Sequence, residues 1–230
     1  MTTTYPAPVE SPVAERVYQP QYDSYLLVDT MRRTGLIPQR RVLDLCTGSG
    51  FIAIAAAEMG CASVTAYDIC PSAVSYSRGN AAGAGVDVDV RQGSWVKALD
   101  HGPYDVVVSN PPYVPTPPLD DTGAIASIAG PSRAYNAGPD GRLVLDPLCG
   151  SASKLLADGG SLLLVHSALA GVEQTLQSLR QTGLTADVVA SQLIPFGPVL
   201  TARAQWLEET GRIGRGCRRE QIVVIRADKL

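Results

Sequence analysis

The stretch SNPPYVPTPP, residues 109–118, sets an asparagine, two prolines and a tyrosine directly after a run of valines. The side-chain oxygen of Asn110 and the backbone carbonyl of Pro111 are two acceptors that can hold both N–H bonds of a planar amide or amino group. A nitrogen held in this way points its lone pair in a fixed direction, toward an electrophilic carbon. The motif therefore predicts a site that positions a weakly nucleophilic nitrogen.

The rest of this NPPY motif supports the same chemistry. Prolines fix φ and carry no N–H that could compete for the acceptor carbonyl, so the loop is held rigid. The ring of Tyr113 offers a flat face to a planar amide or base, and a ring face also favours a nearby cation. A merely stiffened loop would explain the four residues taken alone. We expect the catalytic residues to be Asn110, Pro111, Pro112 and Tyr113.

A glycine-rich turn, in VLDLCTGSGFIAIAAA, follows another apolar run and precedes an apolar helix. Gly48 and Gly50 allow a tight turn and a close approach of the backbone to a ligand, and the amides that open a helix favour a negative group. The carboxylate of Asp44, just before the turn, favours a cation instead. The turn therefore suits a ligand that carries both an ammonium and a carboxylate group.

Asp68 ends the next apolar run, where an acid can bind both hydroxyls of a ribose. A glycine turn or a strand-end acid alone is common in α/β proteins, but the two at the spacing of one βαβ unit predict a nucleoside site. The G-x-G-x-x-G and P-loop lysine motifs are absent. With its acid before a G-x-G turn, the sequence resembles the S-adenosylmethionine-dependent class I methyltransferases. In that class, the position of Trp95 commonly lies against the adenine, although a core tryptophan is the alternative.

The elements that must position these residues alternate along the chain. Strands separated by helices imply right-handed crossovers and a mostly parallel sheet, so the α/β, doubly wound class fits best. The first helix is expected to have Asp23 or Ser24 as its N-cap and Gly35 just beyond its end. The predicted strands are 41–46, 63–68, 86–92, 104–110, 161–167, 185–191 and 220–227, and the predicted helices are 22–33, 50–59, 71–82, 143–157 and 169–181. Residues 193–216 are expected to form an elaborated hairpin.

Composition limits the function classes further. With 230 residues, 45% of them hydrophobic, we expect one domain over residues 16–230 after a loose arm, residues 1–15. No apolar run reaches membrane-spanning length and no signal peptide is visible, which predicts a cytoplasmic protein without membrane contact. The net charge of −3 makes nucleic acid a less favoured partner. The five cysteines form no C-x-x-C pair, so neither a disulfide framework nor a metal site is expected.

Four segments together narrow the resemblance: VYQPQYDSYLL, DLCTGSG, SNPPYVPTPP and GPDGRLVLDPL are similar to the HemK family of protein-glutamine N5-methyltransferases. The resemblance implies a Rossmann-like seven-stranded sheet with an antiparallel last strand, a translation release factor as substrate, and S-adenosylmethionine as cofactor. The short form of the family, which often works with a small zinc-binding activator subunit, is the most similar. The implied cofactor-binding residues are Asp44, Cys46, Thr47, Gly48, Gly50, Asp68, Ile69, Ser94, Trp95 and Asn110. Tyr18, Pro20, Asp23 and Ser24 match a motif that borders the site.

The sequence departs from the family at several places. Cys46 stands where glycine is common, and Ser94 replaces an acid that usually precedes the aromatic residue. There is no room for the N-terminal helical domain that bacterial members use against release factors. A DNA or RNA amino group and a small-molecule amine therefore stay open as acceptors. Four arginines within residues 212–219 are most simply explained as a solvated hairpin, with a contact to RNA or to an acidic partner as the alternative.

Overall fold

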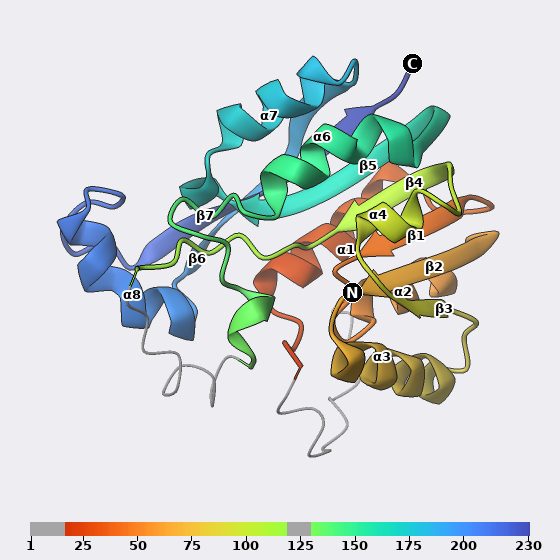
Figure 1. Cartoon of the computed structure of the whole chain (residues 1–230), viewed down its shortest axis with the longest axis horizontal. Coiled ribbons are helices and arrows are strands. Elements are labelled where there is room, and N and C mark those ends of the chain that lie inside the picture. The colour runs from red at the N-terminus through yellow and green to blue at the C-terminus, as the bar shows by residue number, and fades with distance from the viewer. Residues whose placement is uncertain (1–16, 119–129) are drawn as a thin grey trace.

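The centre of the fold is a sheet formed by the predicted apolar segments (Figure 1). This computed structural model describes residues 17–118 and 130–230, so the predicted arm over residues 1–15 lies outside the described residues. The strands are β1 (Arg41–Leu45), β2 (Ser63–Asp68), β3 (Asp89–Gln92), β4 (Tyr104–Ser109), β5 (Leu156–Ser167), β6 (Thr185–Pro195) and β7 (Arg219–Asp228). Their order in the sheet is β3-β2-β1-β4-β5-β7-β6. β7 runs antiparallel to both neighbours and the other pairs are parallel, which confirms the predicted fold class.

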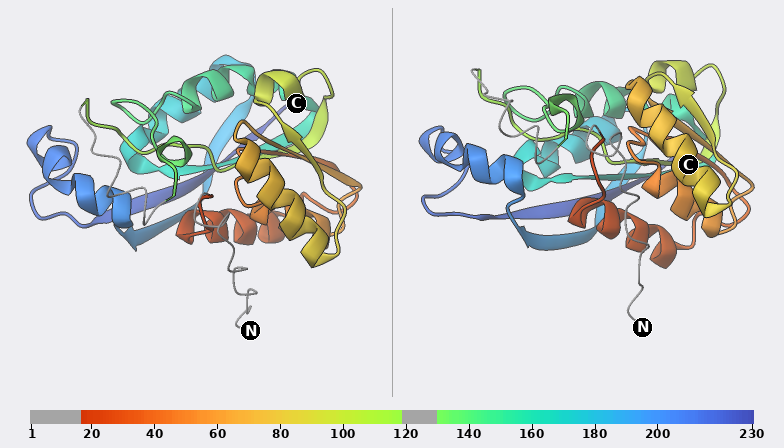
Figure 2. Two further views of the ribbon diagram at one scale, coloured as in Figure 1. Left: turned by 60° about the horizontal axis from the view of Figure 1, so that its bottom comes forward. Right: turned by 90° about the horizontal axis from the view of Figure 1, so that it is seen from below.

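Helices cover both faces of the sheet, because its inner strands are apolar on both sides. The helices are α1 (Tyr22–Thr34), α2 (Phe51–Glu58), α3 (Pro71–Ala84), α4 (Trp95–Ala98), α6 (Leu145–Leu155), α7 (Val172–Gln181) and α8 (Pro198–Glu209). α1, α2 and α3 pack on one face, where Leu27, Met31 and Ile52 join the core. α4, α6 and α7 pack on the other, where Leu148 and Leu179 do the same (Figure 2).

The strand register brings the predicted site residues to one edge of the sheet. Leu45, the last residue of β1, pairs with Tyr67 of β2 on one side and with Ser109 of β4 on the other. The residues that follow these three positions therefore leave the sheet side by side. In open α/β sheets this carboxyl edge, at the point where the strand order reverses, is where ligands bind.

β6 and β7 pair antiparallel up to Pro195 and Arg219, which confirms the predicted elaborated hairpin, and its connection contains the 12-residue helix α8, which was not predicted. Pro198 occupies the first turn of α8, where its fixed φ suits a helix. Leu200, Ala204 and Leu207 are buried at helical spacing on one side. The Pro and Gly content that predicted a hairpin belongs to the two ends of this helix. α8 lies at one extremity of the molecule, next to the β6 and β7 end of the sheet (Figure 1).

The start of α1 also differs from the prediction. The helix begins at Tyr22, and its N-cap residue is Gln21, whose side chain makes no capping hydrogen bond. Asp23 and Ser24 lie inside the first turn and are 4% and 5% exposed. Gly35, with φ of 63°, ends the helix as predicted. The side chains of Asp23 and Ser24 are therefore available for contacts elsewhere in the fold.

Some features of the chain bear on partners and metals. Within residues 17–118 and 130–230, no helix is both long and apolar enough to cross a membrane. The same residues contain no group of three or more His, Cys, Asp or Glu side chains that could hold a metal ion. In the arginine-rich segment, Arg212 lies over the ring of Trp206 and Arg218 pairs with Glu208. These contacts fold the segment against α8 and leave its arginines exposed.

Candidate active site

The turn after β1 has a conformation that favours glycine. Gly48 and Gly50 have φ of 54° and 82°, and Cys46 reaches 61° without being a glycine. A Cβ atom on Gly50 would lie 2.3 Å from Oγ of Ser77 in α3. Gly50 is therefore required for the close packing of the turn on α3, and it does not line the adjoining cavity. Gly48 does line it, with nothing closer than 4.0 Å to an added Cβ atom.

Asp44 lies under this turn and is fully buried. Its Oδ2 accepts a hydrogen bond from Thr47 Oγ1 at 2.6 Å, whereas Oδ1 has no hydrogen-bond partner among the described residues. Burial raises the pKa of the Asp44 carboxyl to about 7; the charge of Asp68 raises it further and the Thr47 hydrogen bond lowers it. A buried carboxyl oxygen without a partner favours a cationic or hydrogen-bonding ligand. The Asp44 carboxyl, as a hydrogen-bond acceptor, thus fits the ammonium group expected of the cofactor.

Asp68, at the end of β2, is held by the backbone on both oxygens. Oδ2 accepts from the amide of Gly48 at 2.9 Å, and Oδ1 accepts from the amide of Cys70 at 2.8 Å. Burial raises the pKa of this carboxyl, and the two amides and the charge of Arg133 act in the opposite direction. The carboxylate is therefore fixed in orientation before any ligand arrives. Such a preset acid is suited to the two hydroxyls of a ribose.

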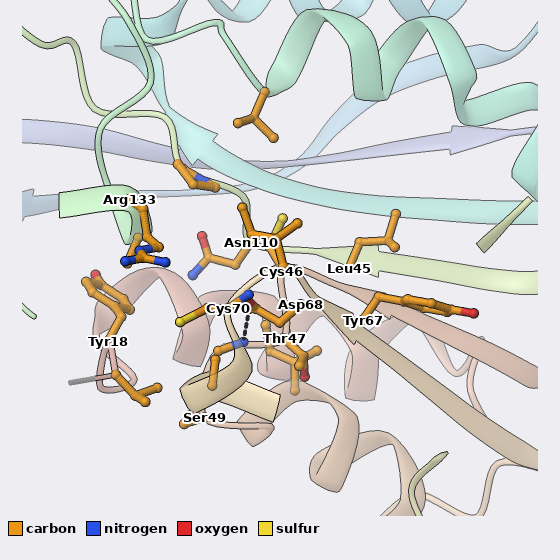
Figure 3. A pocket seen from close by; sticks show the side chains of 18 of the residues that line it. Tyr18, Leu45, Cys46, Thr47, Ser49, Tyr67, Asp68, Cys70, Asn110 and Arg133 are labelled. Carbon is orange, nitrogen blue, oxygen red and sulfur yellow. Dashed lines mark hydrogen bonds between the residues drawn. The ribbon is translucent and has the colours of Figure 1, made fainter. Parts of the chain in front are cut away.

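A cavity of about 160 Å³ adjoins the carboxyl edge of the sheet (Figure 3). Most of the predicted site residues line it: Cys46, Thr47, Gly48, Asp68, Ile69, Ser94, Trp95, Asn110 and Pro112. Tyr18, Pro20 and Ser24 of the upstream motif line it too. Four predicted residues are not on its wall: Asp44, Gly50, Pro111 and Tyr113. The fold thus brings the glycine turn, Asp68, and Asn110 and Pro112 of the NPPY motif to one cavity.

One side of this cavity suits a flat aromatic group. Trp95 opens α4, lines the cavity and also packs against the core beneath it, while its contact with an adenine stays a prediction. Ser94 is the N-cap of α4, and its Oγ accepts from the amide of Val96 at 3.4 Å. The side chain of Ile69 is 61% exposed on the rim. An adenine ring could lie against the apolar side chains of Trp95 and Ile69. This contact does not require the acid that usually stands at the position of Ser94.

The NPPY motif is held in place by the first turn of α1. Nδ2 of Asn110 donates to Oγ of Ser24 at 3.2 Å, and Asp23 Oδ1 accepts from the Ser24 backbone amide at 2.6 Å and from its hydroxyl at 3.2 Å. With its amide nitrogen engaged, Asn110 keeps its side-chain oxygen as an acceptor. The arrangement therefore fixes which end of the Asn110 amide can meet a substrate N–H.

Tyr113 and the loop beyond it are anchored by other contacts. The Tyr113 hydroxyl donates to Asp23 Oδ2 at 2.8 Å, and burial, followed by the charge of Asp23, raises the pKa of this hydroxyl. The backbone of Val114 exchanges hydrogen bonds with Tyr135 and Ala137. The hydroxyl thus fixes the ring in place, a structural role that the sequence analysis did not predict, since it considered only contact of the ring face with the substrate.

Three cavity residues carried no sequence signal of function. Phe51 opens α2, Cys70 precedes α3, and Arg133 lies in the short 3₁₀ turn η2 (Ser132–Ala134) beyond the NPPY loop. The guanidinium of Arg133 faces the cavity near Asp68 and Asn110 (Figure 3). The position after a strand could have indicated Cys70. No spacing rule connects Arg133 to the glycine turn, because the two are far apart in the sequence and lie in different elements.

We expect Ser24→Ala to lower kcat about three- to tenfold, because a neutral hydrogen bond contributes about 0.5–1.5 kcal/mol. The loss should appear in kcat more than in KM, since Ser24 orients Asn110. Ser24→Thr keeps the hydroxyl and should restore most of the activity. Steady-state kinetics of the two variants checks this, and equal losses in both would contradict an orienting role for the hydroxyl.

Comparisons with known proteins agree with this geometry. The sequence profile described as the methyltransferase small domain matches residues 19–128. A chain from Methanocaldococcus jannaschii, named as a candidate protein N5-glutamine methyltransferase, is 28% identical, with 82% of this chain and 91% of that one covered. The release factor glutamine methyltransferase of Deinococcus radiodurans is 41% identical over 61% of this chain. The match covers 49% of that relative, so this chain spans about half of its length.

Among solved structures, the chain is similar to the E. cuniculi Mtq2–Trm112 complex, described as responsible for methylation of the eRF1 translation termination factor. The TM-score is 0.63 at 22% identity, with 94% of this chain and 99% of the other covered. At this identity the likeness concerns the fold, and the fold is that of class I methyltransferases.

Proposed function

The chain belongs to the methyltransferase small domain family and is an S-adenosylmethionine-dependent methyltransferase, and from this premise we propose that it methylates the side-chain amide nitrogen of a glutamine in a protein. The observation that carries the proposal is the fixed amide of Asn110, held by Ser24 at the cavity wall. A translation release factor is the proposed substrate, because relatives of the chain are named for that activity.

On the acceptor side, the chain must make an amide nitrogen nucleophilic. Its lone pair is delocalised, so the N–H bonds have to be held while the nitrogen becomes pyramidal. Asn110 Oδ1 would accept one N–H, and the carbonyl of Pro111, kept rigid by the following proline, would accept the other. The ring of Tyr113, fixed through Asp23, would limit rotation of the amide. These residues would bind and orient the amide. The nitrogen loses one proton when it gains the methyl group, and this proton would pass to water without a strong general base, because a protonated amide is strongly acidic.

On the cofactor side, S-adenosylmethionine supplies a methyl group on a positively charged sulfur, which is already activated for transfer. The residues that would hold it are Thr47 and Gly48 at the turn, Asp68 at the ribose and Trp95 at the adenine. Asp44 would act from beneath the turn, through its unpartnered Oδ1 toward the ammonium group. Most of these side chains line the same cavity as Asn110, which brings donor and acceptor together.

The proposal extends to partners and location. A small activator subunit is proposed because the structurally similar Mtq2 is described in complex with Trm112, and the likeness covers 99% of that chain. Since release factors act in translation, the reaction is placed in the cytoplasm.

Incubating the purified chain with methyl-labelled cofactor and fractionated extract tests the substrate. We expect label in a protein, on glutamine N5 after digestion and mass spectrometry. Label only in nuclease-sensitive material would assign the enzyme to a nucleic-acid amino group, and label only in small solutes to a metabolite. Asp68→Ala is the matched negative control, with a cofactor affinity lowered roughly ten- to a hundredfold by loss of a charged hydrogen bond.

A further inference from the structure

A second cavity, of about 110 Å³, lies beside the cofactor cavity. Tyr18 lines both cavities. Asn110 and Pro112 of the NPPY motif face the first cavity, whereas Tyr113 and Val114 face the second. Any group bound in the second cavity would therefore lie next to the acceptor that Asn110 orients.

Two buried carboxylates line this second cavity. Asp23 from α1 is 4% exposed, and Glu220 from β7 is 8% exposed. Asp23 is satisfied on both oxygens by Ser24, Tyr113 and Tyr18. Oε2 of Glu220, by contrast, has no hydrogen-bond partner within the described part of the chain. An unpartnered buried carboxyl oxygen is costly, so a donor or a cation in the cavity toward which Glu220 can turn would be favoured. Burial also raises the pKa of the Glu220 carboxyl to about 7, and a bound cation would favour its charged form.

Aromatic rings form much of the remaining wall. The rings belong to Tyr18, Tyr22, Tyr113, Tyr135 and Phe196. Ring faces attract cations, and carboxylates beside them strengthen the attraction. None of the described residues on this wall is a lysine or an arginine. Arg203 of α8 lies with its guanidinium 5.5 Å from the centre of the Tyr135 ring and donates to the carbonyl of Pro115, so it supports the wall from outside the cavity.

We propose that the second cavity is a subsite for a cationic side chain, lysine or arginine, of the protein whose glutamine is methylated. The proposal rests on the proposed function for its acceptor. Glu220 would meet the charge, the aromatic rings would contact the aliphatic stem, and the position beside Tyr113 would set the distance from the glutamine. Glu220 would therefore determine specificity, and the cation would fix the register of the acceptor segment against Asn110.

A peptide series tests the subsite with the full chain and S-adenosylmethionine. Each peptide has one central glutamine and a single arginine, lysine or norleucine at one flanking position. We expect a cation at one position to lower KM about tenfold or more relative to norleucine. Glu220→Gln should remove this difference in KM between cationic and neutral peptides, while Glu173→Gln, at an exposed carboxyl on α7, should keep it. Equal KM values for cationic and neutral peptides, or an equal effect of Glu220→Gln on both, would overturn the proposal.

A binding measurement separates this proposal from the proposed function, because it needs no methyl transfer. Butylguanidinium and its neutral analogue butylurea are titrated into the wild-type chain and followed by NMR at the resonances of the second cavity. We expect only the cation to bind, and Glu220→Gln to weaken it at least about tenfold. Indistinguishable binding of the two probes to the wild-type chain would contradict the proposed subsite, even if glutamine peptides are methylated. Selective cation binding without methylation of any peptide would support the subsite and contradict the proposed glutamine acceptor.

Discussion

The Asn110→Ala variant is expected to lose methyl transfer, with kcat lowered roughly a hundred- to a thousandfold, the range known for removing one group that stabilises a transition state directly. Its affinity for S-adenosylmethionine should change much less. The reason is geometric: without the Asn110 oxygen, one N–H of the acceptor amide has no partner and the nitrogen is free to rotate. Single-turnover methylation and calorimetric cofactor binding, measured on the same preparation, check the two halves of this expectation.

A matched control comes from Gln174 on α7, an exposed amide away from both cavities. Gln174→Ala should leave both kcat and cofactor affinity unchanged. If Asn110→Ala kept near-normal turnover, the orientation of the acceptor nitrogen by this residue would be wrong. If cofactor binding fell as far as kcat, Asn110 would act mainly on the cofactor.

The Asp44→Asn variant is expected to stabilise the cofactor-free chain at pH 8 by on the order of 4 kcal/mol, since each pKa unit corresponds to about 1.4 kcal/mol. Burial raises the pKa of the Asp44 carboxyl from 3.8 to about 7. Between these pH values the folded chain holds a proton that the unfolded chain has released, so rising pH destabilises the wild type through this group. Asparagine keeps the Thr47 contact without a charge.

The stability difference between Asp44→Asn and the wild type should therefore be near zero below about pH 4 and grow up to about pH 7. Urea unfolding at a series of pH values measures it. Asp187→Asn, at an exposed carboxyl on β6, should show no such trend. The gain in stability should accompany a loss of cofactor affinity, because the charge that favours the ammonium group is removed. A pH-independent difference would mean that Asp44 is ionised normally in the folded chain.

The sequence by itself determined the sheet and the edge at which the site lies. Apolar runs of strand length, separated by helical periodicity and by Gly and Pro, are local signals, and parallel strands put their carboxyl ends together. Asp68 and Asn110 therefore fall at one edge, because Asp68 is the last residue of β2 and Asn110 directly follows β4. The turn at Gly48 could also be predicted from the sequence, because a positive φ favours glycine whatever the surrounding fold.

Only the tertiary structure decided how these side chains are held. Asp23 and Ser24 looked like helix caps in the sequence, yet they bind Tyr113 and Asn110, 90 and 86 residues further along the chain. Gly50 serves the packing against α3, and Glu220 reaches the second cavity from the last strand. Such partners depend on how helices and loops cross the sheet edge. No periodicity encodes them, because periodicity reports which side of an element is buried and not which distant residue it meets.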